Sequence, residues 1–128
     1  SILKNSLANS GKAALQIITI DEQRAIDYQR QPDFIQQYIF PGGMLPTKKE
    51  LEEINYKVGL DFKEIKSFGL SYAKTLNLWN KQFQNSWDDL AQLGFSKRFK
   101  RMWEFYLSYC ETGFISKSTD VSHFLINR

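Results

Sequence analysis

The apolar residues of this chain form runs and stripes that predict strands alternating with helices. Ala13 to Ile20 is a nearly continuous apolar, β-branched run, which is typical of a strand buried on both faces of a parallel sheet. Asp21 to Gln37 is polar with scattered apolar residues, and it predicts short helical turns broken at Pro32. Leu60 to Phe68 alternates only in part, because Ile65 breaks the period, but its length and flanking glycines favour a strand.

Helix-start and helix-stop residues delimit two further segments. Thr47 and Glu50 form a capping box, which predicts a helix that ends at Gly59. Ser71 predicts the N-cap of the next helix, which ends at Gly94. Apolar residues recur in that segment at spacings of three and four, which indicates an amphipathic helix: Tyr72, Leu76, Trp79, Phe83, Trp87 and Leu90.

The last part of the chain adds one helix and one strand. Ser96 starts a helix with an apolar stripe, and Val121 to Ile126 predicts a final short strand. The resulting order is strand, helical turns and loop, helix, strand, two helices and strand. Such an alternation predicts an α/β sheet carrying helices, and 128 residues limit the chain to a single domain.

Charge says little about partners beyond one basic cluster. The chain holds 17 Lys and Arg against 14 Asp and Glu, a net charge of +3. The sharpest cluster is Lys97, Arg98, Lys100 and Arg101, which fits either a solvated helix start or an attraction to anionic lipid headgroups. No stacking or groove-reading motif accompanies it, so we expect no nucleic acid partner.

The chain has a single cysteine and a single histidine, which limits the catalytic sites that it can form. Cys110 is the only cysteine, which excludes an internal disulfide and a cysteine-based zinc site, and its aromatic helical surroundings indicate a buried, inert thiol. His123 is the only histidine, and its apolar neighbours favour a structural role. We expect no metal site.

No targeting or membrane-spanning segment is recognisable. No apolar run approaches the ~20 residues of a membrane span, and no signal peptide is present, so we expect a cytoplasmic protein. The chain begins without Met, in what looks like the middle of an element, which predicts a piece of a longer protein.

The segment Tyr38 to Pro46 predicts a shaped loop lined by apolar side chains. It reads Tyr-Ile-Phe-Pro-Gly-Gly-Met-Leu-Pro, with a Gly-Gly pair between prolines. Proline fixes φ and glycine permits positive φ, so the segment favours neither a helix nor a strand interior. A second pattern, Phe68-Gly69-Leu70-Ser71-Tyr72, follows the predicted second strand.

Together these motifs resemble the C-terminal part of cyclopropane-fatty-acyl-phospholipid synthases and the related mycolic acid cyclopropane synthases. The resemblance covers nearly all of the chain. It implies the C-terminal half of a Rossmann-like class I methyltransferase sheet, with three strands and covering helices. Residues 1–128 would carry the fifth, sixth and seventh strands, and the half that binds S-adenosylmethionine would be absent, so the chain alone should be inactive.

The resemblance also implies a reaction. The alkene of an unsaturated phospholipid acyl chain takes a methyl group from S-adenosylmethionine, a carbocation forms, and bicarbonate takes a proton so that a cyclopropane ring closes. The family's bicarbonate-binding His falls on Gln16, its Ile on Ile18, and the Tyr of its Phe-Gly-x-x-Tyr pattern on Tyr72. A glutamine can donate a hydrogen bond to a carbonate oxygen, but it cannot change charge as histidine can.

The shaped loop is similar to the family's acyl-pocket wall. The resemblance therefore assigns substrate contact to Tyr38, Phe40, Gly43 and Met44, and none of the residues present to the cofactor. The alternative is that Phe40 and Met44 are ordinary core residues that cover the sheet.

Three functions remain open from the sequence. The first is methylene transfer to an acyl double bond; the second is methylation of an acyl chain or small molecule without ring closure, which Gln16 permits. The third is a non-catalytic, lipid-contacting module. Peripheral contact with the inner membrane face is compatible with all three. We also expect the isolated chain to self-associate, because Ala13 to Ile20 would present an unpaired apolar edge.

Overall fold

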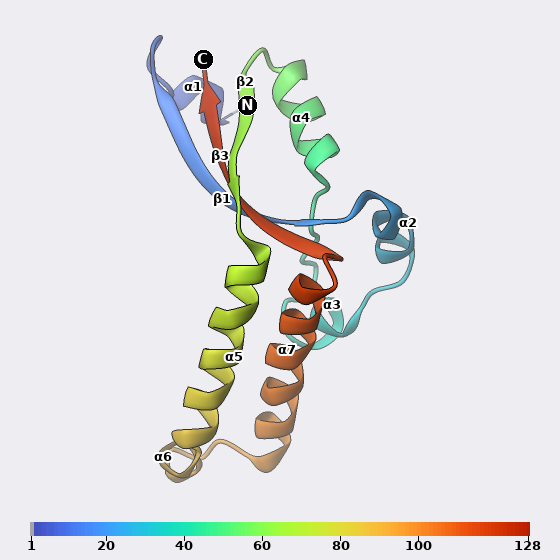
Figure 1. Cartoon of the computed structure of the whole chain (residues 1–128), viewed down its shortest axis with the longest axis vertical. Coiled ribbons are helices and arrows are strands. Elements are labelled where there is room, and N and C mark those ends of the chain that lie inside the picture. The colour runs from blue at the N-terminus through green and yellow to red at the C-terminus, as the bar shows by residue number, and fades with distance from the viewer. Residues whose placement is uncertain (1) are drawn as a thin grey trace.

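The computed structural model describes residues 2–128 and combines one small sheet with helices at its faces and end (Figure 1). Within this range the elements are α1 (Ile2–Ser6), β1 (Lys12–Ile20), α2 (Glu22–Arg30), α3 (Phe34–Tyr38), α4 (Lys48–Lys57), β2 (Asp61–Ser67), α5 (Gly69–Asn85), α6 (Trp87–Gln92), α7 (Lys97–Ile115) and β3 (Thr119–Asn127). From β1 onward the predicted order of strands and helices is confirmed, whereas α1 was not predicted.

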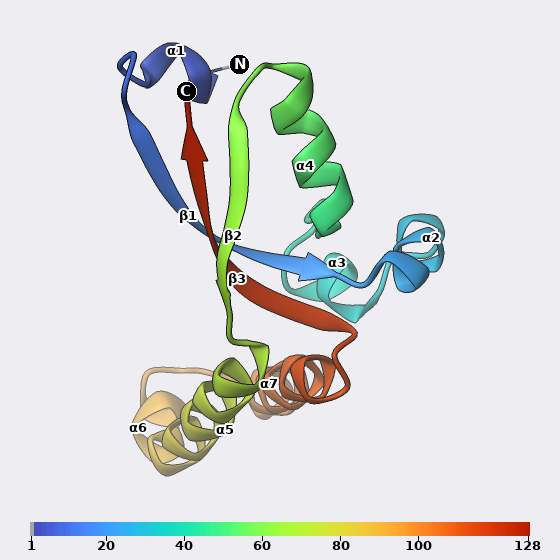
Figure 2. The same cartoon turned by 45° about the horizontal axis from the view of Figure 1, so that its top comes forward.

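The last strand lies in the middle of the sheet. The strand order is β1-β3-β2, and β3 runs antiparallel to both of its neighbours, so β1 and β2 point the same way without touching (Figure 2). The expectation that β1 lies in a parallel sheet with both faces buried is wrong for the described residues. β1 pairs only with β3 there, and Leu15 is 37% exposed. An apolar run does not reveal the direction of its partner strand.

The central strand β3 supplies the most deeply buried side chains. Its alternation sends Val121 to one face of the sheet and Phe124 and Ile126 to the other, and all three are at most 2% exposed. On the second face Phe124 stacks on Phe62 of β2, with ring centroids 4.8 Å apart. The first face meets α5 and α7, where Val121 joins Ala73, Leu76, Leu107 and Phe114 in one buried group, called here the apolar cluster.

Local signals account for α4 and β2. Thr47 and Glu50 form the predicted capping box, and Gly59 has a φ of +67°, a left-handed conformation that suits a glycine ending a helix. In β2 the register with β3 shifts between Glu64 and Lys66. A β-bulge at Ile65 explains why this residue breaks the alternation of the sequence.

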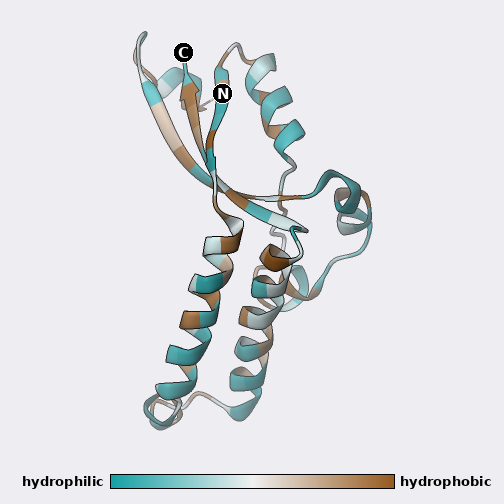
Figure 3. Cartoon of the chain, viewed as in Figure 1, coloured by the Kyte–Doolittle hydropathy of each residue, from teal (hydrophilic) through white to brown (hydrophobic). Residues whose placement is uncertain are grey.

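The helices α5, α6 and α7 form a long hairpin that extends from the end of the sheet (Figure 1). Apolar and polar positions alternate along both long helices, as Figure 3 shows. Two predicted boundaries are wrong. Helix α5 begins at Gly69 and not at Ser71. It ends before Ser86, where the short α6 follows, and does not continue to Gly94. Ser96 does cap α7, accepting the Phe99 amide at 3.2 Å.

The segment between β1 and α4 has the predicted character, with one difference. Asp21 caps α2, and Asp33 caps α3 with a capping box that the sequence analysis did not identify. Tyr38 is the last residue of α3, so the shaped loop begins one residue later than expected. None of the helices in the described part of the chain has the length and apolarity that crossing a bilayer requires.

Candidate functional site

The C-terminal ends of β1 and β2 lie at the same end of the sheet as the start of β3, and this end is called here the edge of the sheet. β1 finishes at Ile20 and β2 at Ser67, while β3 starts at Thr119, so α5 leaves and α7 arrives at this same edge. In α/β folds, ligands bind beside the carboxyl ends of strands. The predicted site residues of β1 and α5 lie close to this edge.

Gln16 is paired across the sheet with the only histidine of the sequence. The two residues are register partners, and His123 Nε2 lies 3.1 Å from Gln16 Oε1. The amide oxygen only accepts, so the imidazole Nε2–H donates, and the Gln16 amide keeps its N–H donors. The His123 ring also packs edge-on against Phe68, at 4.7 Å. His123 therefore orients Gln16, a role that sequence reasoning missed because the residues lie 107 positions apart.

Ile18 and Tyr72 come together at the apolar cluster. Both are partly buried and pack against it, Ile18 from β1 and Tyr72 from the first turn of α5. The Tyr72 ring contacts Phe114 at 5.1 Å and Trp79 at 6.0 Å, both edge-on. Within residues 2–128 its hydroxyl forms no hydrogen bond. Tyr72 thus has a fixed ring and a hydroxyl free to donate.

α7 contributes two side chains that the sequence analysis did not assign to the site. Tyr106 and Cys110 pack partly buried against the apolar cluster. Burial raises the pKa of Tyr106 to about 12, and the neighbouring Cys110 and Tyr72 add to this rise. Burial also raises the pKa of the Cys110 thiol to about 11, as expected for an inert cysteine. Both groups stay neutral near pH 7, so this wall of the site is apolar.

The shaped loop sends one of its apolar residues to this wall. Phe40 contacts Tyr106 edge-on, with centroids 6.1 Å apart. A tight turn holds it: the Gly43 amide donates to the Phe40 carbonyl at 2.9 Å, and Gly42 between them has a φ of +80°. A Cβ at Gly43 would lie 3.0 Å from that carbonyl oxygen. The glycine pair therefore serves the turn that presents Phe40.

Two predicted substrate residues point elsewhere. Tyr38 is 58% exposed and contacts Phe34 of its own helix at 5.4 Å. Met44 lines a shallow groove between α2 and α4. Neither is brought to Tyr72 or Tyr106 by the described residues.

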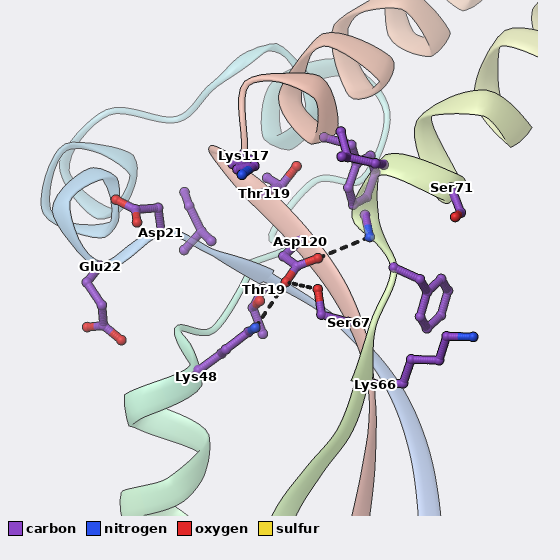
Figure 4. A pocket seen from close by; sticks show the side chains of 15 residues that line it. Thr19, Asp21, Glu22, Lys48, Lys66, Ser67, Ser71, Lys117, Thr119 and Asp120 are labelled. Carbon is purple, nitrogen blue, oxygen red and sulfur yellow. Dashed lines mark hydrogen bonds and ion pairs between the residues drawn. The ribbon is translucent and has the colours of Figure 1, made fainter.

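A polar network on the other face of the sheet anchors α4 and α5, and it lines a pocket of about 610 Å³ (Figure 4). Asp120 accepts from Ser67 Oγ at 2.7 Å and from Lys48 Nζ at 3.0 Å. Its other oxygen accepts from the Gly69 amide at 3.2 Å. Lys48 also pairs with Glu64 at 2.6 Å. Asp120 thus satisfies the first amide of α5, the role that Ser71 was expected to play.

The ionisation of this network favours folding at neutral pH. Partial burial by itself raises the pKa of Asp120, but the hydrogen bonds from Ser67 and Lys48 outweigh it and lower the pKa. A carboxyl with a lower pKa in the folded state stabilises the fold above its unfolded pKa of about 4. That stabilisation is lost as the pH falls through the folded pKa.

We expect Asp120→Ala to lower the free energy of unfolding by about 1–2 kcal/mol, the cost of a lost helix cap with a partly exposed ion pair. Urea denaturation at pH 7 measures this change, and Asp27→Ala on the exposed side of α2 is the control. The deficit of Asp120→Ala should shrink toward pH 3, where the wild-type carboxyl becomes protonated. A deficit that stays constant over this range would contradict the ionic role of Asp120.

Comparison with known proteins identifies the class that this fold and site define. Residues 1–124 match the family described as mycolic acid cyclopropane synthetase. The tuberculostearic acid methyltransferase UfaA1 of Mycobacterium tuberculosis is 39% identical over 98% of this chain. The cyclopropane-fatty-acyl-phospholipid synthase of Escherichia coli K12 is 30% identical over 74% of it. The mycolic acid cyclopropane synthase CmaA1, solved with SAH and CTAB, is 25% identical over 98% of the chain, with a TM-score of 0.85.

The chain belongs to the mycolic acid cyclopropane synthetase family of S-adenosylmethionine-dependent methyltransferases. Its strands and helices are those of the C-terminal half of a class I methyltransferase sheet, as the sequence predicted. It spans 30% of the length of UfaA1, 24% of the Escherichia coli synthase and 47% of the CmaA1 chain.

Proposed function

We propose that this chain is the part of a lipid methyltransferase that closes a cyclopropane ring on the double bond of an unsaturated phospholipid acyl chain. One observation carries the proposal. Tyr72, whose hydroxyl has no hydrogen bond among residues 2–128, packs against the same apolar cluster as Ile18 and Tyr106, and Tyr106 contacts Phe40. A hydrogen-bond donor at the border of an apolar site suits a small anion held beside a hydrocarbon chain.

The methyl donor does not fit the residues present. The strand-to-helix turns here are Asp21 after β1 and Phe68-Gly69 after β2, and neither is the glycine-rich turn that cradles such a cofactor. S-adenosylmethionine, held by residues that are not in this chain, would supply the transferred carbon. We expect these 128 residues alone to be inactive.

The donors present do fit bicarbonate. The Tyr72 hydroxyl and the Gln16 amide are both free to donate within residues 2–128, and Ile18 lies on the Gln16 face of β1. In the reaction, an alkene carbon bonds the incoming methyl group, and the cation left on the chain loses a proton from that methyl as the ring closes. Held beside this cation, bicarbonate would accept the proton, and Tyr72, Gln16 and the Ile18 backbone would orient it.

The apolar wall would hold the acyl chain and exclude water. Tyr106 and Cys110 are neutral and pack against the same cluster as Tyr72, and Phe40, which is 56% exposed, contacts Tyr106. A dry, neutral site strengthens the hydrogen bonds to the anion and keeps water from the carbocation. Gly43 would contribute through the turn that positions Phe40. Tyr38 and Met44 would touch lipid only at the outer part of the loop.

A second candidate function is methyl addition without ring closure. Gln16 occupies the place of the family's histidine, and a neutral amide cannot relay a proton. UfaA1, the relative at 39% identity, is described as a tuberculostearic acid methyltransferase and not as a cyclopropane synthase. The product distinguishes the two functions.

Lipid analysis of cells expressing the full-length gene tests both. We expect mass spectrometry to show that unsaturated phospholipid acyl chains gain the mass of one CH2 group, and proton NMR to show the cyclopropane ring in place of the double bond. Exocyclic methylene or methyl-branched chains would support the second function. Unchanged lipids from a folded, expressed enzyme would overturn both.

Gln16→Leu should lower the turnover of the intact enzyme on the order of 10²-fold, because a donor to the bicarbonate is lost while the strand keeps its shape. Gln16→His restores a donor and should retain most activity. Gln23→Leu, on the exposed surface of α2, is the matched control. Wild-type turnover in Gln16→Leu would remove this residue from the site.

A further inference from the structure

The end of the helical hairpin that lies farthest from the sheet in Figure 1 carries exposed apolar residues and basic residues. This hairpin tip comprises residues 93–101, the turn after α6 and the first turns of α7. Leu93 is 77% exposed and Phe95 is 43% exposed. Gly94 between them has a φ of +93°, and a Cβ there would meet no atom within 4 Å. The turn therefore faces open space at Gly94.

Basic side chains surround this apolar turn. Lys97, Arg98 and Arg101 are exposed, and none of them forms an ion pair within residues 2–128. Lys100 is engaged, since it pairs with Glu104 at 3.3 Å and lies 5.5 Å from the centre of the Trp87 ring. The nearby acidic residues Asp88 and Asp89 lie in the first turn of α6. With Lys100 paired to Glu104, three unpaired basic residues against two acidic ones leave the tip positive.

An unbroken row of aromatic rings connects the tip with the candidate site. Phe95 contacts Phe99 at 4.9 Å, Phe99 stacks on Trp103 at 5.6 Å, and Trp103 contacts Tyr106 at 5.0 Å. Tyr106 then meets Phe40 at the apolar wall. Within α7, the helical rise from Phe99 to Tyr106 corresponds to about 10 Å. The row is continuous from the tip to Tyr106 and Phe40 at the apolar wall.

We propose that the hairpin tip is a membrane-docking surface whose partner is an anionic phospholipid bilayer. Leu93 and Phe95 insert at the boundary between headgroups and acyl chains, and Lys97, Arg98 and Arg101 bind lipid phosphates. The aromatic row of α7 then guides one acyl chain from the bilayer to the site. The last step rests on the proposed function, whereas the docking itself does not.

The mixture of side chains favours a lipid surface over an acidic protein. Leu93 is exposed, and it is close in sequence to long basic side chains. The aliphatic stems of Lys and Arg can cover apolar surface while their charges stay in water. An apolar turn bordered by Lys and Arg is the pattern of interfacial membrane binding, in which insertion and headgroup attraction add together. An acidic protein partner would use the charges and leave Leu93 without a role.

Vesicle co-sedimentation of the intact enzyme tests the docking. The vesicles contain phosphatidylcholine with or without phosphatidylglycerol, in low and high salt. We expect binding that requires phosphatidylglycerol and weakens as salt rises. The variant Lys97→Gln/Arg98→Gln/Arg101→Gln should bind on the order of 100-fold more weakly, since each basic residue near an anionic surface contributes about fivefold. The matched control Lys49→Gln/Lys57→Gln/Lys63→Gln removes three exposed lysines of α4 and β2.

Leu93→Ser tests the apolar part. It should weaken binding about tenfold without changing the salt dependence, and Ile54→Ser on α4 should bind as the wild type does. Binding by the tip variants equal to wild type would overturn the proposal. Loss of charge-dependent binding with no effect of Leu93→Ser would instead indicate an acidic protein partner and would also overturn it.

Activity on detergent-dispersed phospholipid separates this proposal from the proposed function. We expect the tip variants to lose activity on vesicles and to keep it on dispersed substrate. Enzyme that acts on dispersed lipid but shows no tip-dependent vesicle binding would refute docking alone. Enzyme that binds vesicles through the tip but modifies no lipid in either form would refute the proposed function alone.

Discussion

Replacing Tyr72 by Phe should reduce turnover of the intact enzyme by about 10²–10³-fold, the usual effect of removing one donor from a preorganised anion site. The ring contacts with Phe114 and Trp79 remain, so the fold should be unchanged. Lipid turnover with purified enzyme measures the effect. Circular dichroism and thermal denaturation confirm that the variant is folded.

Tyr56→Phe provides the control for Tyr72→Phe. Tyr56 is on α4 and is 83% exposed, so loss of its hydroxyl should leave turnover within about twofold of wild type. If Tyr72→Phe also turned over at the wild-type rate, the hydroxyl would have no part in the reaction. Tyr72 would then be only a packing residue of the apolar cluster.

Phe114→Ala should cost about 3–5 kcal/mol of stability, because it opens a large cavity in the apolar cluster. Phe114 is 4% exposed and supports the Tyr72 ring at 5.1 Å. Urea denaturation of the intact enzyme measures the loss. We also expect lower activity in the fraction that remains folded, since Tyr72 loses its fixed position.

Phe105→Ala on the same helix is the control for that cavity. Phe105 is 51% exposed, so its removal should cost about 1 kcal/mol. Equal costs for the two variants would mean that the apolar cluster does not dominate the packing between α5 and α7. Phe114→Leu should recover most of the lost stability, because it refills the space.

Most helix and strand positions could be predicted from the sequence because they depend on local interactions. The capping box at Thr47, the stop at Gly59 and the cap at Ser96 all act within one helical turn, so short patterns reveal them. The β-bulge at Ile65 was visible as a fault in the alternation. The start of α5 was misjudged, because its amide is satisfied by Asp120, 51 residues further along.

The candidate site divides in the same way. Resemblance to a family proposes Gln16, Ile18 and Tyr72 as site residues, but only the sheet register reveals that His123 lies opposite Gln16. Tyr106 and Cys110 belong to a helical stripe that equally describes ordinary core. Only the fold shows that their stripe borders Tyr72 and Phe40. Contacts between distant residues depend on topology, which local patterns do not encode.

The central place of β3 has a consequence for synthesis of the protein. The sheet needs β3 between β1 and β2, yet β3 is the last of the three strands that the ribosome makes. While residues 12–115 emerge, β1 and β2 have no common partner, and their apolar faces stay uncovered. The sheet can close only after Thr119–Asn127 has left the exit tunnel. Closure of this sheet therefore waits for β3, and nascent chains must be protected from aggregation until that strand has emerged.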